Sequence, residues 1–299
     1  MNRRSCIKYL ALAAMLDPID MMAAVPRIRA EELKRRFTVL PEIAPAKVVP
    51  GGAPTIVMDD KHIKDYLSKI RHPNRPHPGD IVLDRNGKAL LKSVVKRLQR
   101  VRSHVGHGNF CILGYADCLK IARNAPRVGA FPTVEENFME EIFFRDAKEY
   151  GFMGEKQITS LTENINPLDV YKVPYSGNYL YLGASYEKYL KIRQEVGEEL
   201  VLTSGIRGLT KQFYLFMSKA DRYDGNLSLA SRSLAPPGYS YHATGDFDVG
   251  QRGFGGGNFS EEFTHTRVFS QLIDLGYVRS RYERDNMFGV RYEPWHIKL

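Results

Sequence analysis

Apolar residues recur at helical spacing in several stretches of the first half of the chain. Between residues 87 and 103 they form one face of a predicted helix, which consists of Leu90, Leu91, Val94, Val95, Leu98 and Val101. This spacing is typical of an amphipathic helix that packs against a core. Similar spacing predicts helices over residues 58–70 and 133–150, and Thr133 with Glu136 is expected to form a capping box at the start of the latter.

The pattern changes after about residue 165, where short apolar runs alternate with helical stretches. We expect helices over residues 184–198, 208–219 and 260–275 and short strands over 200–203 and 245–250. Short strands interspersed with helices in this way are typical of an α+β protein with an antiparallel sheet.

The chain ends in two further apolar runs, YVRSRY and GVRYEPWHIKL, which predict a hairpin with its turn at residues 284–288. The expected fold is therefore α+β. An antiparallel sheet with flanking helices is expected over residues 165–299, preceded by a mainly helical unit over residues 31–150. Within that unit, residues 31–57 are rich in Pro and Ala without a clear period, which predicts a linker.

Length and composition exclude several classes of protein. The chain has 299 residues, of which 43% are hydrophobic and 26% charged, so it is not disordered throughout. The net charge of +9 lies in the first half, because residues 151–299 carry 17 Lys/Arg and 17 Asp/Glu. A neutral second half argues against binding of nucleic acid. The basic stripe over residues 88–100 is expected to be a solvated helix face or a contact with anionic lipid or wall polymer.

The first residues are typical of an export signal. Arg3 and Arg4 precede an apolar run from Tyr9 to Leu16, and the string RRSCIK is similar to the twin-arginine motif. Residues 1–24 are therefore predicted to be a signal peptide, which implies a periplasmic location. An amphipathic N-terminal helix is the alternative.

Reactive side chains gather near the C-terminal end of the chain. His242, Asp246 and Asp248 lie within one short segment, and Glu293 and His296 lie in the last few residues. Two imidazoles and one carboxylate, with a fourth position open for water, make up a typical catalytic zinc site. A further carboxylate can act as general base. Both aspartates would face the same side of a strand, so their spacing leaves open which one is the ligand.

Three motifs in this part of the chain occur in a fixed order. The first is SGIR, which ends at Arg207 and is followed by Gln212. The second is SYHATG, which contains His242, follows a PPG and leads to DVG at Asp248. The third is EPWH, which ends at His296. In these motifs residues 165–299 resemble the VanY-type D-alanyl-D-alanine carboxypeptidases, which are related to lysostaphin-like peptidases and to the hedgehog signalling domain.

The resemblance implies a zinc ion held by His242, Asp248 and His296. It also implies that Glu293 takes a proton from the attacking water and later delivers it to the leaving amine. Arg207 is expected to donate to the scissile carbonyl or to the terminal carboxylate of the substrate, because its planar fork matches an oxyanion. The expected substrate contacts are Ser204, Gln212 and Ser240.

The sequence departs from the family pattern near the expected metal. The interval between His242 and Asp248 is one residue shorter than in the family. Alignment on DVG favours Asp248 as the ligand and leaves Asp246 as an alternative ligand or a supporting partner. Ile206 replaces the tyrosine of the first motif, which affects substrate contacts more than the metal. Trp295 is expected to pack as a wall that orients the neighbouring ligand.

The function expected from the resemblance is that of a zinc carboxypeptidase that trims the terminal D-alanine from peptidoglycan stem peptides. Two alternatives within the class are an L,D-carboxypeptidase and an endopeptidase acting on the same polymer. A third alternative is a non-catalytic module that binds the cell wall. The intact Glu293 argues against this third alternative, because a binding module needs no base beside the metal.

Overall fold

The computed structural model describes residues 37–38, 60–278 and 281–299. The predicted signal peptide and most of the predicted linker lie outside these residues. The longer helices are α2 (Asp60–Arg71), α3 (Arg85–Val105), α5 (Tyr115–Asn124), α6 (Thr133–Phe144), α7 (Ala184–Val196), α8 (Leu209–Arg222) and α10 (Arg267–Asp274). The shorter helices are α4 (His107–Ile112) and α9 (Leu227–Ser231).

Short 3-10 turns occur between these elements. They are η2 (Ala147–Tyr150), η3 (Pro167–Asp169), η4 (Tyr241–Ala243), η5 (Gly255–Phe259) and η6 (Glu261–His265).

The strands are short and pair antiparallel in three small sheets. β1 (Phe37–Thr38) pairs with β2 (Val82–Leu83), and β3 (Val170–Lys172) pairs with β4 (Tyr179–Tyr181). The third sheet has the order β5 (Leu200–Ser204), β6 (Phe247–Gln251) and β7 (His296–Ile297). Helices together with antiparallel sheets confirm the predicted α+β class.

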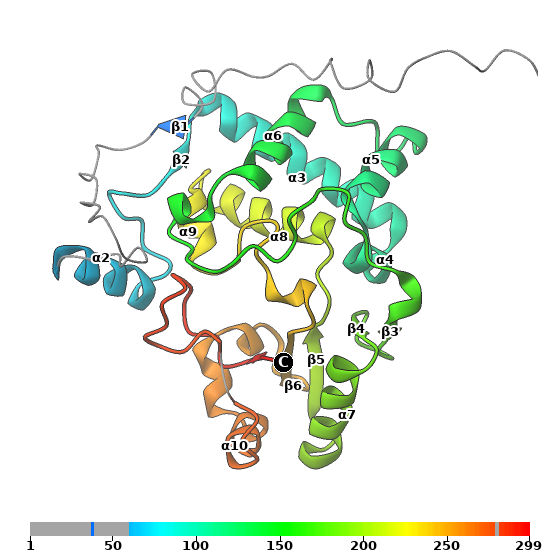
Figure 1. The fold of residues 1–299 in the computed structure, drawn as a ribbon, viewed down its shortest axis with the longest axis vertical. Helices are drawn as coiled ribbons and strands as arrows, with labels where there is room; N and C mark the ends of the chain where they lie inside the picture. The colour runs from blue at the N-terminus through cyan, green and yellow to red at the C-terminus, as the bar shows by residue number, and fades with distance from the viewer. Residues whose placement is uncertain (1–36, 39–59, 279–280) are drawn as a thin grey trace, which may run out of the picture. The chain divides into compact units, whose positions relative to one another are not determined.

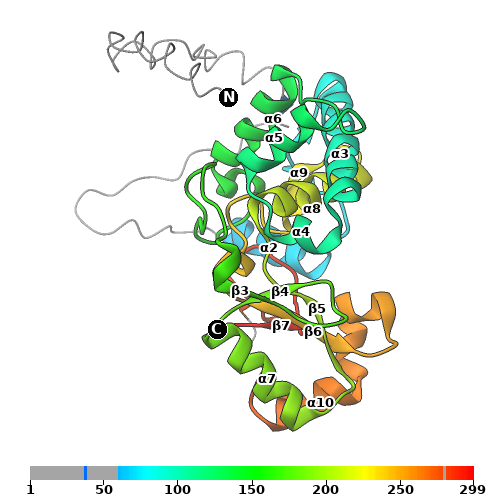
Figure 2. The same cartoon turned by 90° about the vertical axis from the view of Figure 1, so that its right-hand side faces the viewer.

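One apolar core joins helices from both halves of the chain. The predicted apolar face of α3 is buried at Leu91, Val94, Leu98 and Val101. It packs in one cluster with Phe213 and other buried side chains of α8 and α9. Figures 1 and 2 show α8 beside α3 and α4. The helices at residues 209–231 thus complete the core begun by the N-terminal helices.

A second core lies on one face of the three-stranded sheet. Leu200 and Leu202 of β5 and Phe247 and Val249 of β6 pack there in one cluster with buried residues of α7 and α10. In Figure 2, α7 and α10 lie on one side of this sheet and the helices of the first core lie on the other. The alternation of buried and half-buried positions in β5 matches a strand with one face in this core.

The predicted C-terminal hairpin is wrong. Among the described residues between α10 and β7, none belongs to a strand. The Asn286 side chain closes this segment instead, because its amide donates to the carbonyls of Glu283 (2.6 Å) and Val290 (2.7 Å). The Asn286 carbonyl also accepts from the backbone N–H of Phe288 at 2.9 Å. Bonds from one side chain thus replace the expected strand ladder.

Two predicted helix boundaries also differ. Thr133 lies inside α6, and Pro132 takes the N-cap position without a side-chain bond, so the capping box does not form. The predicted helix over 260–275 divides at Thr266, whose hydroxyl accepts from the backbone N–H of Phe269 at 3.2 Å and caps α10. No helix in the described ranges combines the length and hydropathy that a transmembrane span requires.

A buried ion pair ties the segment before β2 to the segment that follows α9. Asp80 and Arg232 are both almost fully buried, and the guanidinium of Arg232 donates to the Asp80 carboxylate. Asn226 donates to the other oxygen of Asp80 at 2.9 Å. Arg232 also donates to the carbonyl of Arg75 at 2.7 Å. The backbone around residue 232 is therefore held from several directions.

We expect Asp80→Ala to lower the free energy of unfolding by about 3–5 kcal/mol, because the Arg232 charge would stay buried without its partner. Glu261→Ala is the matched control, since Glu261 pairs with Arg284 at 2.6 Å while its side chain is 58% exposed. That change should cost less than about 1 kcal/mol. Chemical unfolding monitored by fluorescence measures both. Equal effects of the two variants would contradict a structural role for the buried pair.

Candidate active site

The register of the three-stranded sheet brings the second and third motifs together. Asp248 of β6 lies opposite His296 of β7 on one side and opposite Ser204 of β5 on the other. The register of β5 shifts between Leu202 and Ser204, so Thr203 has no partner in β6. Directly opposite residues in an antiparallel pair have side chains within reach of each other. Residues that are far apart along the chain therefore meet at Asp248.

His242 reaches the same point from outside the sheet. It lies in η4, and its Nδ1 donates to the carbonyl of Gly205 at 2.8 Å. This bond places the ring proton on Nδ1 and leaves the lone pair of Nε2 free. Nε2 lies 3.3 Å from Oδ1 of Asp248. On the other side, Nδ1 of His296 lies 3.1 Å from the same oxygen.

The three side chains fit a divalent cation with tetrahedral coordination. One ligand atom from each of His242, Asp248 and His296 lies within 4.8 Å of the other two. Zinc bonds of about 2.0–2.1 Å at tetrahedral angles separate neighbouring ligand atoms by about 3.3–3.4 Å. The two histidine-to-aspartate distances of 3.3 and 3.1 Å are close to this value. All three residues are at least 97% buried, as a dry site requires.

The charge states of two of these side chains also suit a cation. Burial, together with the charge of Arg207, lowers the pKa of His242 to about 4, so its ring is neutral near neutral pH. Burial alone would raise the pKa of Asp248. The neighbouring His242 and Arg207 outweigh burial and hold that pKa well below its usual range. A neutral imidazole and an ionised carboxylate are the forms that bind metals.

Asp246 lies behind the group of three and not in it. Its Oδ2 lies 2.9 Å from Nε2 of His296, the ring nitrogen that faces away from Asp248. Arg281 donates to the same oxygen at 2.9 Å, and the backbone N–H of Leu299 donates to Oδ1 at 3.0 Å. The spacing of the two aspartates left the ligand undecided, and the geometry places Asp248 with the histidines. Asp246 orients His296, as second carboxylates commonly do for metal-binding histidines.

The two carboxylates also favour positive charge at His296. Burial alone would lower the pKa of this imidazole, but its hydrogen bonds to Asp246 and Asp248 raise it to about 9. A cation bound between His296 and Asp248 would meet the same favourable field as the proton.

Glu293 has the proton affinity of a base that works near neutral pH. Burial, followed by repulsion from Asp248, raises the pKa of Glu293 to about 7. Its backbone carbonyl accepts from the N–H of His296 at 3.1 Å, so the two residues are held in one turn. A carboxyl group with this pKa can both accept and release a proton during turnover.

Arg207 joins the first motif to the expected metal ligands. Its guanidinium donates to Oδ2 of Asp248 at 2.5 Å and to the hydroxyl of Ser204 at 3.1 Å. Ser204 is thus engaged with Arg207 in this structure. Arg207 also lines a small pocket together with the two histidines and Glu293. Its guanidinium group therefore contacts the expected ligand Asp248 and also faces the space expected for the substrate.

This pocket holds some of the expected substrate contacts and leaves out others. Ser240 lines it, whereas Ser204 and Gln212 are not among its lining residues. The Gln212 amide donates to the carbonyl of Arg207 at 2.7 Å and accepts from the backbone N–H of Gly238 at 2.9 Å. The nitrogen and the oxygen of this side-chain amide are therefore both engaged with backbone, and they connect the backbone at Arg207 to that at Gly238.

The helical half of the chain supports the same stretch of backbone. The N–H of Gly208 donates to the carbonyl of Cys111 at 2.7 Å, and the hydroxyl of Thr210 donates to the carbonyl of Gly114 at 2.9 Å. The ammonium of Lys211 lies 3.2 Å from the sulfur of Cys111. The turn between α4 and α5 therefore positions the residues that follow Arg207.

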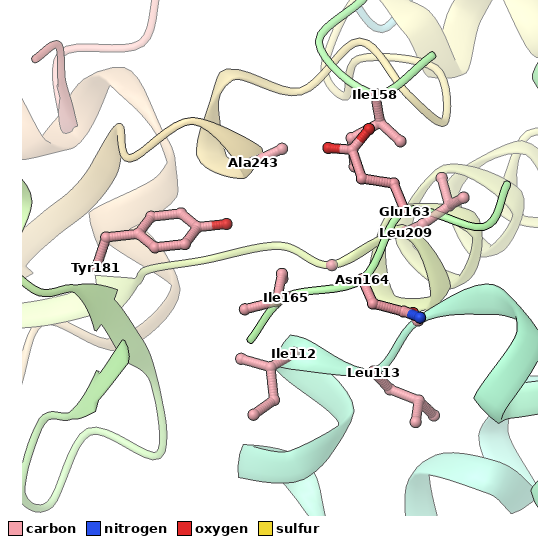
Figure 3. Close-up of a pocket in the computed structure, with 11 residues that line it drawn as sticks. Ile112, Leu113, Ile158, Glu163, Asn164, Ile165, Tyr181, Leu209 and Ala243 are labelled. Atoms are coloured by element: carbon pink, nitrogen blue, oxygen red, sulfur yellow. The ribbon is translucent and has the colours of Figure 1, made fainter. Parts of the chain in front are cut away.

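Figure 3 shows a separate pocket next to this turn, lined mainly by apolar side chains such as Ile112, Ile158 and Leu209. Tyr181 and Glu163 point toward its interior. Its lining residues include neither an expected metal ligand nor a lysine or arginine.

Trp295 packs in the second apolar core, where only 2% of it is exposed. The guanidinium of Arg291 lies 4.9 Å from its ring centre, and its backbone carbonyl accepts from the N–H of Val249 at 3.0 Å. These contacts anchor the residue that precedes His296.

Several residues that line the active-site pocket belong to none of the three motifs. They are Ser233, Leu234, Ala235, Tyr282 and Val290. Three of them directly precede the PPG that leads into the second motif, which was the available signal. Tyr282 and Val290 lie in the segment for which the sequence predicts a hairpin, and a hairpin does not predict that they face the metal site.

Comparison with known proteins agrees with the motifs. Residues 181–299 match the family model described as VanY: D-alanyl-D-alanine carboxypeptidase. None of the curated proteins compared with the chain matches it.

A solved structure similar to the chain is a mutant of the vancomycin resistance D,D-pentapeptidase VanY from a VanB-type resistance cassette, in complex with Zn(II). The two share 20% sequence identity over 50% of this chain and 85% of the other, with a TM-score of 0.37. The family match begins at residue 181 and includes all three motifs. It also includes His242, Asp248 and His296, the three residues of the candidate metal site. Residues 181–299 of this chain are therefore similar to the VanY D-alanyl-D-alanine carboxypeptidase family.

Proposed function

We propose that the protein is a zinc-dependent D,D-carboxypeptidase that removes the terminal D-alanine from peptidoglycan stem peptides. The observation that carries this proposal is the convergence of His242, Asp248 and His296 at one point. Both histidines also line a pocket together with Glu293. Two histidines and one carboxylate are a common donor set of catalytic zinc sites. The family match supplies the substrate class.

The residues of the pocket divide the work of amide hydrolysis. When bound, zinc supplies a Lewis acid that polarises the scissile carbonyl and makes water a better nucleophile near neutral pH. Glu293 accepts a proton from the water while the water oxygen attacks the carbonyl carbon. The same carboxyl then delivers the proton to the departing amine as the C–N bond breaks. Arg207 stabilises negative charge on the substrate.

Two related activities use the same chemistry. An L,D-carboxypeptidase or an endopeptidase would differ from the proposed enzyme only in which peptide bond of the substrate it places beside Glu293. A non-catalytic module that binds the wall is a further alternative, and a carboxyl group with a pKa near 7 argues for catalysis.

We also propose that the protein is exported to the periplasm, supported by Arg3, Arg4 and the apolar run that follows them. Cell fractionation tests this location.

We expect Glu293→Gln to lower the rate of D-alanine release by about 10²–10⁴-fold, because the proton acceptor is lost. Zinc content should stay at the level of the unchanged protein. Mass spectrometry of muropeptides ending in D-Ala-D-Ala, digested with and without a chelator, measures the products. The control is Glu283→Gln, an exposed acid in the same segment, which should retain full activity. Unchanged release by the Glu293 variant would overturn the proposed base.

Asp246→Asn should weaken zinc binding by about 10–100-fold, because the amide holds His296 less firmly than the carboxylate does. Competition with a chromogenic chelator measures this affinity without reference to activity. Asp274→Asn, at an exposed position in α10, is the matched control. Wild-type zinc affinity in the Asp246 variant would show that this carboxylate does not support the metal site.

We further propose that the exposed face of α3 binds a phosphate-bearing surface, either lipid headgroups or wall polymer. Lys96, Arg100, His104 and Arg127 line one open groove there. Among the described residues, neither Lys96 nor Arg127 forms an ion pair, and the α3 sequence contains no acidic residue. Clustered unpaired cations attract anionic surfaces.

The double variant Lys96→Glu with Arg127→Glu should lose binding to vesicles that contain phosphatidylglycerol, and wild-type binding should fall as salt rises. Binding to isolated wall polymer, measured in parallel, distinguishes the two sources of phosphate. Lys172→Glu with Lys191→Glu, two exposed positions away from the groove, is the control. Equal binding by both double variants in both assays would rule out this surface.

A further inference from the structure

Ser233 carries a buried hydroxyl that has no hydrogen-bond partner among the described residues. The residue is only 5% exposed, and it lines the same pocket as Arg207 and Glu293. Buried polar atoms nearly always have a partner, and one that lacks a partner at a catalytic pocket needs an explanation. A ligand that supplies the missing acceptor is the explanation that the position of the residue favours.

The backbone at Ser233 is held by hydrogen bonds, so the hydroxyl can change its position only by rotation of the side chain. The preceding Arg232 is fixed by Asp80, and its carbonyl accepts from the backbone N–H of Arg291 at 2.8 Å. The N–H of Ser233 itself donates to the carbonyl of Ala230 at 3.1 Å. A ligand that accepts from this hydroxyl therefore meets a backbone that is already ordered, which lowers the cost of binding.

The other residues of the pocket indicate which chemical group the ligand presents. Arg207 supplies positive charge, and Ser240, which is 5% exposed, also lines the pocket and does not cap η4 with its side chain. Ala235 and Val290 add small apolar surfaces. A cation with two available hydroxyl donors suits a carboxylate, and the small apolar surfaces suit a methyl group. The pocket in Figure 3 is less suitable for a carboxylate, because it contains Glu163 and no lysine or arginine.

We propose that the Ser233 hydroxyl donates a hydrogen bond to the free terminal carboxylate of the substrate and so selects chain ends over internal peptide bonds. This inference rests on the proposed function, and it adds a specificity-determining residue outside the three motifs. It predicts a carboxypeptidase and argues against an endopeptidase, because an internal bond offers no carboxylate at that position.

The test compares two peptides that both end in D-Ala-D-Ala, one with a free carboxylate and one with a terminal amide. We expect the wild-type enzyme to prefer the acid. Ser233→Ala should lower kcat/KM for the acid by about 10–100-fold, mainly through KM, and should change the amide little, because a hydrogen bond to a charged group is lost. The ratio of the two rates is independent of the fraction of folded enzyme.

Ser218→Ala is the matched control, because Ser218 in α8 also has a buried hydroxyl without a partner but does not line the pocket. It should keep the wild-type ratio. The same peptides are titrated calorimetrically into Glu293→Gln protein with and without the Ser233 change, so that binding is read without turnover. A Ser233→Ala enzyme with the wild-type preference for the acid, in rate and in binding, overturns the inference. Absence of D-alanine release from both peptides by the wild type would instead refute the proposed function.

Discussion

The site depends on the two antiparallel pairings made by β6. Asp248 faces His296 across one pairing and Ser204 across the other, and the hydrogen bond from His242 to Gly205 adds the remaining imidazole. A register shift of one residue in β7 would turn the side chain of His296 to the other face of the sheet. The apolar core formed by the sheet with α7 and α10 holds this register, because Phe247 and Val249 of β6 are fully buried in it.

The same arrangement concentrates buried charge, which a stable fold avoids unless function requires it. Asp246 and Asp248 both contact His296. Arg207 contacts the other oxygen of Asp248, and Arg281 contacts the same oxygen of Asp246 as His296 does. The helical half offsets part of this cost, since its turn between α4 and α5 hydrogen-bonds the backbone that follows Arg207. The N-terminal helices therefore contribute to the site by fixing backbone, although none of their side chains lines the active-site pocket.

The sequence predicted the α+β class, most helices and the residues that converge at Asp248, because periodicity and short motifs are local signals. It could not choose between Asp246 and Asp248, since both face the same way along a strand and only the pairing with β7 separates them. Ser233 was missed because an orphaned hydroxyl is a property of packing. The predicted hairpin is wrong for a similar reason: the runs at 277–282 and 289–299 indicate strands, while the side chain of Asn286 closes the segment between them through hydrogen bonds.

We propose that one cation binds between the sheet and η4. This binding can be tested with a crystal of the purified protein grown with zinc, with anomalous diffraction recorded at the zinc edge. We expect one peak per chain at about 2.0–2.2 Å from Nε2 of His242, Nδ1 of His296 and a carboxylate oxygen of Asp248. A zinc peak held by other residues, or imidazole nitrogens too far apart to share one ion, would contradict it.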